Sequence, residues 1–392
     1  MNKYIILLVA VVIQLCLGAS YAWSTFVPAL KQDFGLTTAQ TQTIFGLSSL
    51  VCTLFIFVGG RIQDRLGPLI PAVCGGIIFG CGYILAGYSG GSYPALLLFI
   101  GVFSAIGVGL CYLCPIACCI KWFPLHKSLV TGIAVAGYGG SAILISRVGE
   151  HFLAAQVSPL TIFKYLGFCF LIIIPLAAII LQNPTPEGDQ KQMHAGTGMA
   201  ELLHDRHFWG LVCGIFPCLC VGLMIIGNIK TFGLSLNLNL AAAGASVSIL
   251  AFFNAFGRIS WGVIGSLMEG KKAIIASLIS TTAVCLAAPF AIKDNVTFSI
   301  FAVLAGFNYG ACLVLYAAET AHHYGARQMG MAYSTLLLAN GVAGFVAPPV
   351  AGRIYDLTGS YTPAFLIFGT LSLICVFLFY FVYQPAGRAS ED

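Results

Sequence analysis

Charged residues are scarce in this sequence. Only 8% of its 392 residues are Asp, Glu, Lys or Arg, whereas an ordinary soluble domain carries about 25%. So few charges cannot solvate the surface of a soluble protein, which excludes a soluble fold. The net charge of +5 is spread thinly, and no run of Lys or Arg and no basic helix face is present. Nucleic acid is therefore excluded as a partner.

Residues that carry enzyme chemistry are missing from the apolar stretches. All 7 histidines fall in expected loops or at the ends of expected spans, which leaves no Ser/His pair and no H-E-x-x-H motif. Most of the 15 cysteines lie within apolar sequence. The closest set, Cys111, Cys114, Cys118 and Cys119, has no neighbouring histidine to complete a zinc site. We expect no enzyme activity, no cofactor and no metal.

Long apolar runs make up most of the chain. Hydrophobic residues account for 59% of the sequence, and a helix that crosses a bilayer needs about 20 such residues in succession. The runs predict an all-α membrane protein with twelve transmembrane helices. The expected spans are residues 4–27, 43–60, 69–88, 95–120, 129–145, 165–181, 208–229, 241–264, 273–292, 298–318, 331–350 and 364–383.

One long polar segment divides the spans six and six. Residues 183–207 are read as a cytoplasmic linker between an N-terminal six-helix bundle, 1–182, and a C-terminal one, 208–392. Most Lys and Arg residues lie in loops on the side of the N-terminus, so the positive-inside rule places both termini in the cytoplasm. We expect a monomeric, multi-pass protein of the cytoplasmic (inner) membrane, embedded in the lipid bilayer.

Two short segments resemble each other. "GRIQDRLG" begins at Gly60 after the second span, and "GRIYDLTG" begins at Gly352 after the eleventh. In the expected topology they lie on opposite faces of the membrane, a relation that inverted three-helix repeats within each half would produce. Chance similarity of two turn sequences is the alternative.

The first of these segments also resembles a family signature. Gly60, Asp64, Arg65 and Gly67 match the G-x-x-x-D-R-x-G loop of the major facilitator superfamily, which implies that fold and a conformational role for the loop. "GASYAWSTF" in the first span, "KWFP" after the fourth and "NAFGRISWG" in the eighth are similar to the oxalate:formate antiporter family, which is related to the monocarboxylate transporters. That resemblance implies a small carboxylate substrate. It also places Leu336 where oxalate carriers have a lysine, which argues against a dicarboxylate.

Arg258, in the middle of the eighth span, is the predicted anion-binding residue. It is the only Lys or Arg that the assignment places deep in the membrane, and no Asp or Glu falls in the central part of an expected span. A guanidinium offers a carboxylate two parallel hydrogen bonds, so the substrate is the expected counter-ion. Asn254 lies one turn earlier on the same helix face. A structural role, with helix-end carbonyls around Arg258, is the alternative.

Polar side chains on other spans are expected to complete the pocket. A tyrosine can donate its hydroxyl to a carboxylate while its ring encloses an apolar tail. Membership of interfacial aromatic belts is the alternative. Asn228 is read as a further amide donor or as a helix-packing residue, and Lys230 is expected at the outer mouth with its stem snorkelling. By alignment with the family, the central, cavity-facing tyrosines are Tyr21, Tyr112, Tyr138, Tyr309 and Tyr333.

These features predict a secondary active transporter that moves a small monocarboxylate, such as pyruvate, lactate or formate, by alternating access. Proton symport and exchange are both open as coupling modes, and an oxalate:formate-type exchange of a dicarboxylate is the alternative function. Glu319, beside His322 and His323, is the strongest proton-carrying position, with a solvated helix end as its alternative. A channel is disfavoured because no charged ring or filter-like loop is present.

Overall fold

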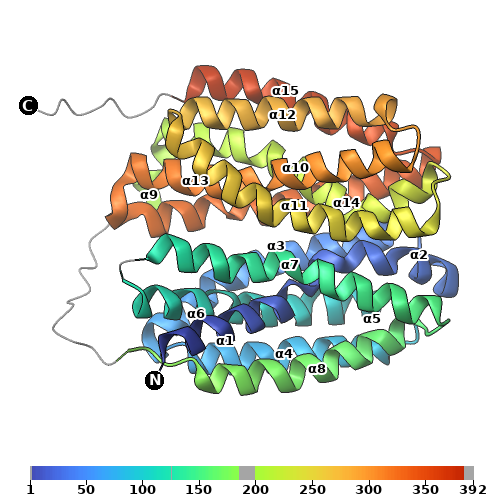
Figure 1. Ribbon diagram of the computed structural model, residues 1–392, viewed down its shortest axis with the longest axis horizontal. Helices are drawn as coiled ribbons and strands as arrows, with labels where there is room; N and C mark the ends of the chain where they lie inside the picture. The colour runs from blue at the N-terminus through green and yellow to red at the C-terminus, as the bar shows by residue number, and fades with distance from the viewer. Residues whose placement is uncertain (1, 125, 185–198, 384–392) are drawn as a thin grey trace, which may run out of the picture.

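The computed structural model describes residues 2–124, 126–184 and 199–383, without the side chains of residues 64, 127–129, 199–201 and 325–330. The described chain is almost entirely helical, and the helices run side by side along the longest axis of the molecule (Figure 1). Within these described ranges, twelve helical segments are long and apolar enough to cross a membrane. The predicted number of spans is therefore confirmed.

The N-terminal half is built from the first six spans. Its first span is broken by a 3-10 turn and its fourth by a stretch of π-helix, Leu97–Ser104. The helices are α1 (Lys3–Leu17), the 3-10 turn Gly18–Ala22, α2 (Trp23–Phe34), α3 (Thr38–Leu66), α4 (Leu69–Gly87), α5 (Tyr93–Leu96), α6 (Ala105–Trp122), α7 (Lys127–Ala154) and α8 (Pro159–Ile180).

The C-terminal half follows a short helix, α9 (Met199–His204), which lies within the segment expected to be the linker. The backbone stays helical between the tenth and eleventh spans, so α13 contains the tenth and the first part of the eleventh. The helices are α10 (Arg206–Ser235), α11 (Leu240–Leu267), α12 (Gly270–Ala291), α13 (Asn295–Leu336), α14 (Leu338–Thr358) and α15 (Thr362–Val382).

The helix ends follow from local sequence. The hydroxyl of Thr37 accepts a hydrogen bond from the backbone N–H of Gln40, and the backbone N–H of Thr37 donates to the side-chain oxygen of Gln40; this capping box starts α3. Gly67 ends the same helix with φ +79°, and Gly359 ends α14 with φ +70°. Only glycine adopts this left-handed region without strain. The two resembling segments therefore end their helices with the same turn residue.

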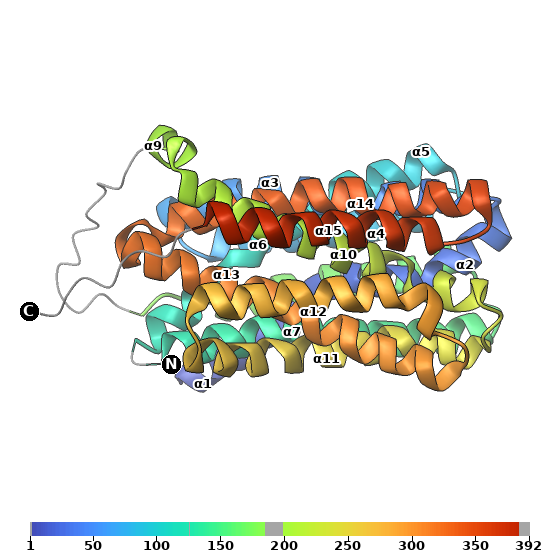
Figure 2. The same ribbon diagram turned by 90° about the horizontal axis from the view of Figure 1, so that it is seen from above.

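The two halves lie beside each other along their full length. In Figure 1 the blue-to-green helices form one half and the yellow-to-red helices the other, and α3 packs against α14 while α7 packs against α11 (Figure 2). The helix α1 begins and α15 ends at one end of the molecule, where α9 also lies; we call this the linker end and the opposite one the far end.

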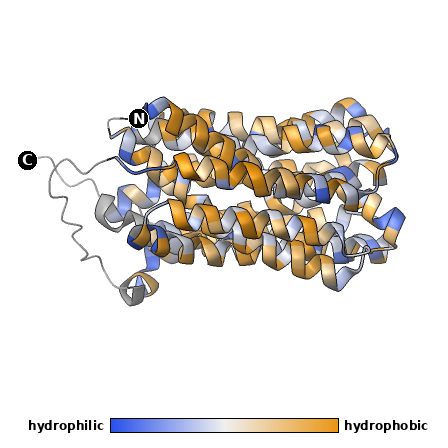
Figure 3. Cartoon of the chain, turned by 90° about the horizontal axis from the view of Figure 1, so that it is seen from below, coloured by the Kyte–Doolittle hydropathy of each residue, from blue (hydrophilic) through white to orange (hydrophobic). Residues whose placement is uncertain are grey.

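The outer surface of the helices is apolar. Hydrophobic residues cover the middle of the molecule, and polar residues gather toward its two ends (Figure 3). A contiguous apolar surface of this extent would aggregate in water, whereas lipid tails solvate it. The protein is therefore a multi-pass membrane protein. Large apolar side chains that point outward include Leu176, Phe252, Ile259, Phe290 and Phe381.

Candidate functional site

Arg258 lies midway along α11 and is buried, with 9% of its surface exposed. Its Nε atom donates to Oδ1 of Asn254 at 3.3 Å, and its Nη1 atom donates to the backbone carbonyl of Val135 in α7 at 3.4 Å. In the part of the chain that the structure describes, no carboxylate pairs with it. Arg cannot lose its proton, so a full positive charge stands between the two halves without a protein counter-ion.

Close contact between α11 and α13 fixes the position of this charge. A Cβ atom at Gly310 would lie 2.6 Å from the backbone nitrogen of Arg258, and one at Gly257 would lie 2.3 Å from the carbonyl oxygen of Phe307. Any larger residue would push the helices apart, because real Cβ atoms do not approach so closely. The glycines let the two backbones touch at the level of Arg258 and hold it in place.

Asn254 has an unused donor beside the guanidinium. Its Oδ1 atom accepts from Arg258, but its Nδ2 atom is buried and has no hydrogen-bond partner in the described structure. Buried donors are normally paired, so this one indicates a missing acceptor. A carboxylate that accepts from both Arg258 and Asn254 would supply that acceptor.

Tyrosine rings surround the same point. The hydroxyls of Tyr21 and Tyr309 lie 3.3 Å apart and join the two halves. The ring of Tyr138 packs edge-on against Tyr21 and Tyr112, with centroid distances of 5.1 Å and 5.3 Å. Tyr309 directly precedes Gly310, which lies against the backbone of Arg258. Tyr309 therefore links Tyr21, and through Tyr21 the rings of Tyr138 and Tyr112, to the position of Arg258.

Other hydroxyls and amides are already engaged. Tyr333 donates to the carbonyl of Leu313 at 2.9 Å, and Tyr138 bonds to the hydroxyl of Ser20 at 3.2 Å. Asn228 donates to the carbonyl of Met224, one helical turn earlier, and accepts from Tyr361 at 3.1 Å. Asn228 lines a separate small cavity and does not join the Arg258 cluster.

A small apolar cavity adjoins Asn254. Apart from Tyr21 and Asn254 its walls are aliphatic, from α7, α10 and α11. Such a wall suits a short hydrocarbon tail and offers no partner to a second charge. The lining side chains include Ala142, Ile226, Ile229, Val247 and Leu250.

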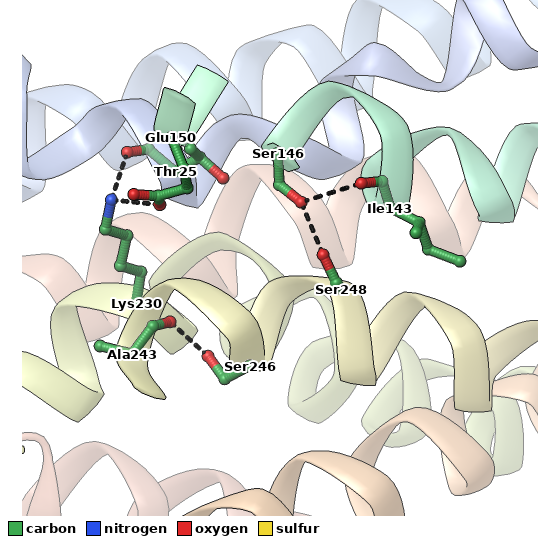
Figure 4. A network of polar contacts seen from close by, with 8 residues as sticks. All are labelled: Thr25, Ile143, Ser146, Glu150, Lys230, Ala243, Ser246 and Ser248. Atoms are coloured by element: carbon green, nitrogen blue, oxygen red, sulfur yellow. Dashed lines mark hydrogen bonds and ion pairs between the residues drawn. The ribbon is translucent and has the colours of Figure 1, made fainter. Parts of the chain in front are cut away.

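Lys230 is buried at the far end, which contradicts the expectation that it snorkels at an outer mouth. Its side chain is 3% exposed, and its Nζ atom lies 2.5 Å from Oε1 of Glu150 and 3.1 Å from the carbonyl of Thr25 (Figure 4). The fifth apolar run ends near residue 145, but α7 continues to Ala154 and carries Glu150 inside the span. Glu150 and Lys230 were both expected outside the spans, and the structure places them inside, four and five residues before the ends of their spans. The expectation that the central parts of the spans hold no acid concerns other positions.

Further bonds close the far end between the halves. Ser146 in α7 and Ser248 in α11 have hydroxyls 2.9 Å apart (Figure 4), and the side chain of Gln42 donates to the carbonyl of Gly227 at 2.7 Å. The carboxylate of Asp356 accepts from the first two backbone amides of α3, which is where a helix favours negative charge. Asp356 belongs to the second of the two resembling segments, which therefore binds the opposite half.

The bonds between the halves named above share a location. They lie at the level of Arg258 and Tyr21 or nearer the far end. The protein is therefore closed at the far end. Substrate can reach Arg258 only by a path from the linker end, or after the far-end bonds break.

Comparison with known proteins shows the family. The sequence model of the Major Facilitator Superfamily matches residues 8–292 and, in a second match, residues 224–392. The chain belongs to the Major Facilitator Superfamily. The solved structures agree on the fold: a bacterial homologue of the human lysosomal transporter Spinster, in an inward-facing and unoccupied conformation, superposes with a TM-score of 0.74 at 16% identity, over 98% of each chain. A D-xylose-proton symporter gives a TM-score of 0.74 at 15% identity, over 98% of this chain and 99% of its own.

The names of two sequence relatives refer to carboxylates. This chain is 27% identical to the oxalate:formate antiporter of Oxalobacter formigenes, over 99% of this chain and 93% of that protein. It is 23% identical to human monocarboxylate transporter 12, over 88% of this chain and 73% of that protein. The resemblance to the superfamily and to these carboxylate transporters is thereby confirmed, and the relatives are transporters and not enzymes.

The superfamily loop lies at the linker end. Gly60 and Arg65 are part of the last turns of α3, Arg65 is exposed, and Gly67 forms the left-handed turn that ends the helix. The side chain of Asp64 lies outside the described residues. The conformational role of this loop stays a prediction.

Two further expected positions are buried. Leu336 is 1% exposed and stands at the end of α13, one residue before the break in the eleventh span. Glu319 is 5% exposed and accepts a hydrogen bond from the hydroxyl of Tyr383, so its alternative reading as a solvated helix end is wrong. The proton-carrying role of Glu319 stays a prediction.

Proposed function

We propose that this transporter moves a small monocarboxylate across the cytoplasmic (inner) membrane by alternating access, as a monomer with both termini in the cytoplasm. The observation that carries the proposal is Arg258: a buried guanidinium without a carboxylate among the described residues, next to the unpaired Nδ2 of Asn254. A buried charge without a counter-ion is costly, and a ligand that supplies one is favoured. A planar carboxylate matches both donors at once.

Among the described side chains between the halves, one buried positive charge lacks a protein counter-ion and is available to the substrate. Lys230 is the other buried cation between the halves, and Glu150 neutralises it. The uncharged tail of a monocarboxylate can lie against the aliphatic cavity beside Asn254. A dicarboxylate would instead place a second negative charge against walls that offer it no partner. An unpaired buried charge costs about 3 to 5 kcal/mol, which is a factor of at least ~100 in affinity. Pyruvate, lactate and formate fit this site better than oxalate.

Exchange of oxalate and formate is the second candidate function. It is favoured by the relative in Oxalobacter formigenes, whose similarity covers 99% of this chain. The two candidate functions differ in the number of negative charges that the site must balance: one for a monocarboxylate and two for oxalate. A cation that enters with the substrate, such as a proton, would remove that difference.

Transport by purified protein in proteoliposomes tests the proposal. Uptake of labelled pyruvate, lactate, formate and oxalate is measured with and without an internal counter-substrate and with and without a pH gradient. We expect at least one labelled monocarboxylate to accumulate, with oxalate competing at least ~100-fold more weakly than the same unlabelled monocarboxylate. Equal competition by oxalate would refute the one-cation argument. Uptake stimulated by a pH gradient alone identifies symport, and uptake that requires internal substrate identifies exchange.

A further inference from the structure

A cluster of two imidazoles and a carboxylate lies at the linker end, away from the Arg258 site. Asp205 precedes α10, His207 is in its first turn, and His323 is near the end of the tenth span in α13. The imidazole rings have centroids 4.6 Å apart, and Nε2 of His323 lies 3.9 Å from Oδ2 of Asp205. One ligand atom from each of the three residues lies within 4.8 Å of the others.

Both imidazoles have an unused polar atom. The Nδ1 atoms of His207 and His323 are buried and have no hydrogen-bond partner in the described structure. Buried polar atoms are normally satisfied by protein, water or an ion. Two orphaned nitrogens in adjacent rings, beside a carboxylate, indicate that this cluster is built around a group that it can ligate.

The carboxylate is held ready for a positive partner. Oδ1 of Asp205 accepts from the backbone amide of His207 at 2.9 Å, and Oδ2 accepts from the hydroxyl of Tyr324 at 2.5 Å. A carboxylate whose position is fixed by neighbouring hydrogen-bond donors is the usual arrangement for a metal ligand.

We propose that Asp205, His207 and His323 bind a divalent transition-metal ion such as Zn²⁺. Two imidazoles and one carboxylate are a ligand set that Zn²⁺ and similar ions accept, with water in the remaining position. Mg²⁺ and Ca²⁺ prefer oxygen ligands and do not suit it. Ligand atoms about 2.1 Å from a tetrahedral Zn²⁺ are about 3.4 Å apart, and the present separations reach at most 4.8 Å, so the groups must approach one another by up to about 1.4 Å on binding.

The metal would fasten the start of α10 to the end of the tenth span. All three ligands belong to the C-terminal half, so the site does not have to break when the halves move relative to each other. Its effect is to stabilise the point where the segment from α9 enters the bundle. The site is independent of the carboxylate proposal, and neither stands or falls with the other.

Titration of the purified full-length protein with Zn²⁺ tests the site. The affinity tag is removed, metals are stripped with a chelator, and binding is followed by calorimetry together with the thermal unfolding temperature. We expect one ion per chain with a rise in unfolding temperature, and no response to Mg²⁺. His207→Gln and His323→Gln should each weaken binding at least about tenfold, as loss of metal-site residues does. His322→Gln, one residue away on the same helix, is the matched control and should leave binding unchanged.

His323→Cys separates ligation from a merely structural role. Cysteine replaces an imidazole as a Zn²⁺ ligand, so this variant should bind the ion more tightly than His323→Gln does. Comparing variants with the wild type also cancels any contribution from the 15 cysteines of the chain. Absence of saturable Zn²⁺ binding by the wild type, or equal binding by the wild type and both Gln variants, would overturn the proposal.

Discussion

The Lys230–Glu150 pair is expected to hold the far end closed. It joins α10 of one half to α7 of the other, and Lys230 is 3% exposed while Glu150 is 30% exposed. Removing one partner of a fully buried pair costs about 3 to 5 kcal/mol. Because Glu150 keeps partial access to water, we expect Glu150→Gln to destabilise the closed far end by a smaller amount, about 2 to 3 kcal/mol. That change shifts the equilibrium between closed and open far ends by about 30- to 150-fold.

Hydrogen–deuterium exchange of the purified protein measures this shift directly. The peptides to follow begin at Thr37, whose helix end is capped by Asp356, and at Tyr361 near Asn228. Exchange there requires the far end to open, so Glu150→Gln should speed it by about the same factor. Peptides at the linker end should exchange as in the wild type.

Two variants serve as controls for this experiment. Glu269→Gln removes a carboxylate from the exposed pair with Lys272, whose side chain is 71% exposed, and should change far-end exchange little. The double variant Glu150→Gln with Lys230→Met removes both charges and leaves neither unpaired, so it should recover part of the protection lost in the single variant. Unchanged far-end exchange in Glu150→Gln would refute the role of the pair.

The remaining predictions concern the anion site and the far-end cap. Arg258→Lys and Arg258→Gln should abolish most uptake without loss of membrane insertion, because lysine keeps the charge but not the planar fork; Lys293→Gln, at an exposed cation, should transport normally. Tyr112→Phe or Tyr309→Phe should weaken substrate affinity about tenfold if each hydroxyl bonds to a charged group, typically worth ~1.5 kcal/mol or more, and unchanged affinity in both would assign them structural roles. Asp356→Ala should lower stability by about 0.5 to 2 kcal/mol in thermal unfolding, since it removes the carboxylate that accepts from the first two amides of α3; an unaltered unfolding temperature would contradict that role.

Local sequence was sufficient to predict what depends on short range. The number of spans follows from apolar runs, and the pairing of Arg258 with Asn254 follows from their spacing of one helical turn. The turn glycines at Gly67 and Gly359 could likewise be expected from the two resembling segments. Each of these features involves residues close together in the chain, where helix geometry alone fixes the neighbours.

Contacts between distant parts of the chain could not be predicted in this way. Glu150 was placed outside the fifth span because Arg147 interrupts the apolar run, although α7 continues beyond both. Nothing in the sequence indicates that Lys230 reaches across to that carboxylate, or that His207 and His323 stack at the linker end. In each case the partner is supplied by the packing of two helices, and apolar periodicity does not specify which polar residues will face each other.

The two buried cations that the described structure places between the halves, Lys230 and Arg258, differ in whether the protein supplies their counter-ion. Lys230 has its counter-ion in the protein, so its pairing with Glu150 stabilises one closed state and must be broken to leave it. Arg258 has its nearest partners in Asn254 and the carbonyl of Val135, which are neutral, so a carboxylate can replace the contact to Val135 without removing an ion pair. Val135 belongs to the opposite half. An anion that accepts the Nη1 hydrogen bond of Arg258 in place of the Val135 carbonyl therefore also releases one bond between the halves. If the proposed site at Arg258 binds an anion, binding would be coupled to the freedom of the halves to move, and it could shift their equilibrium only by as much as the anion prefers one state over the other.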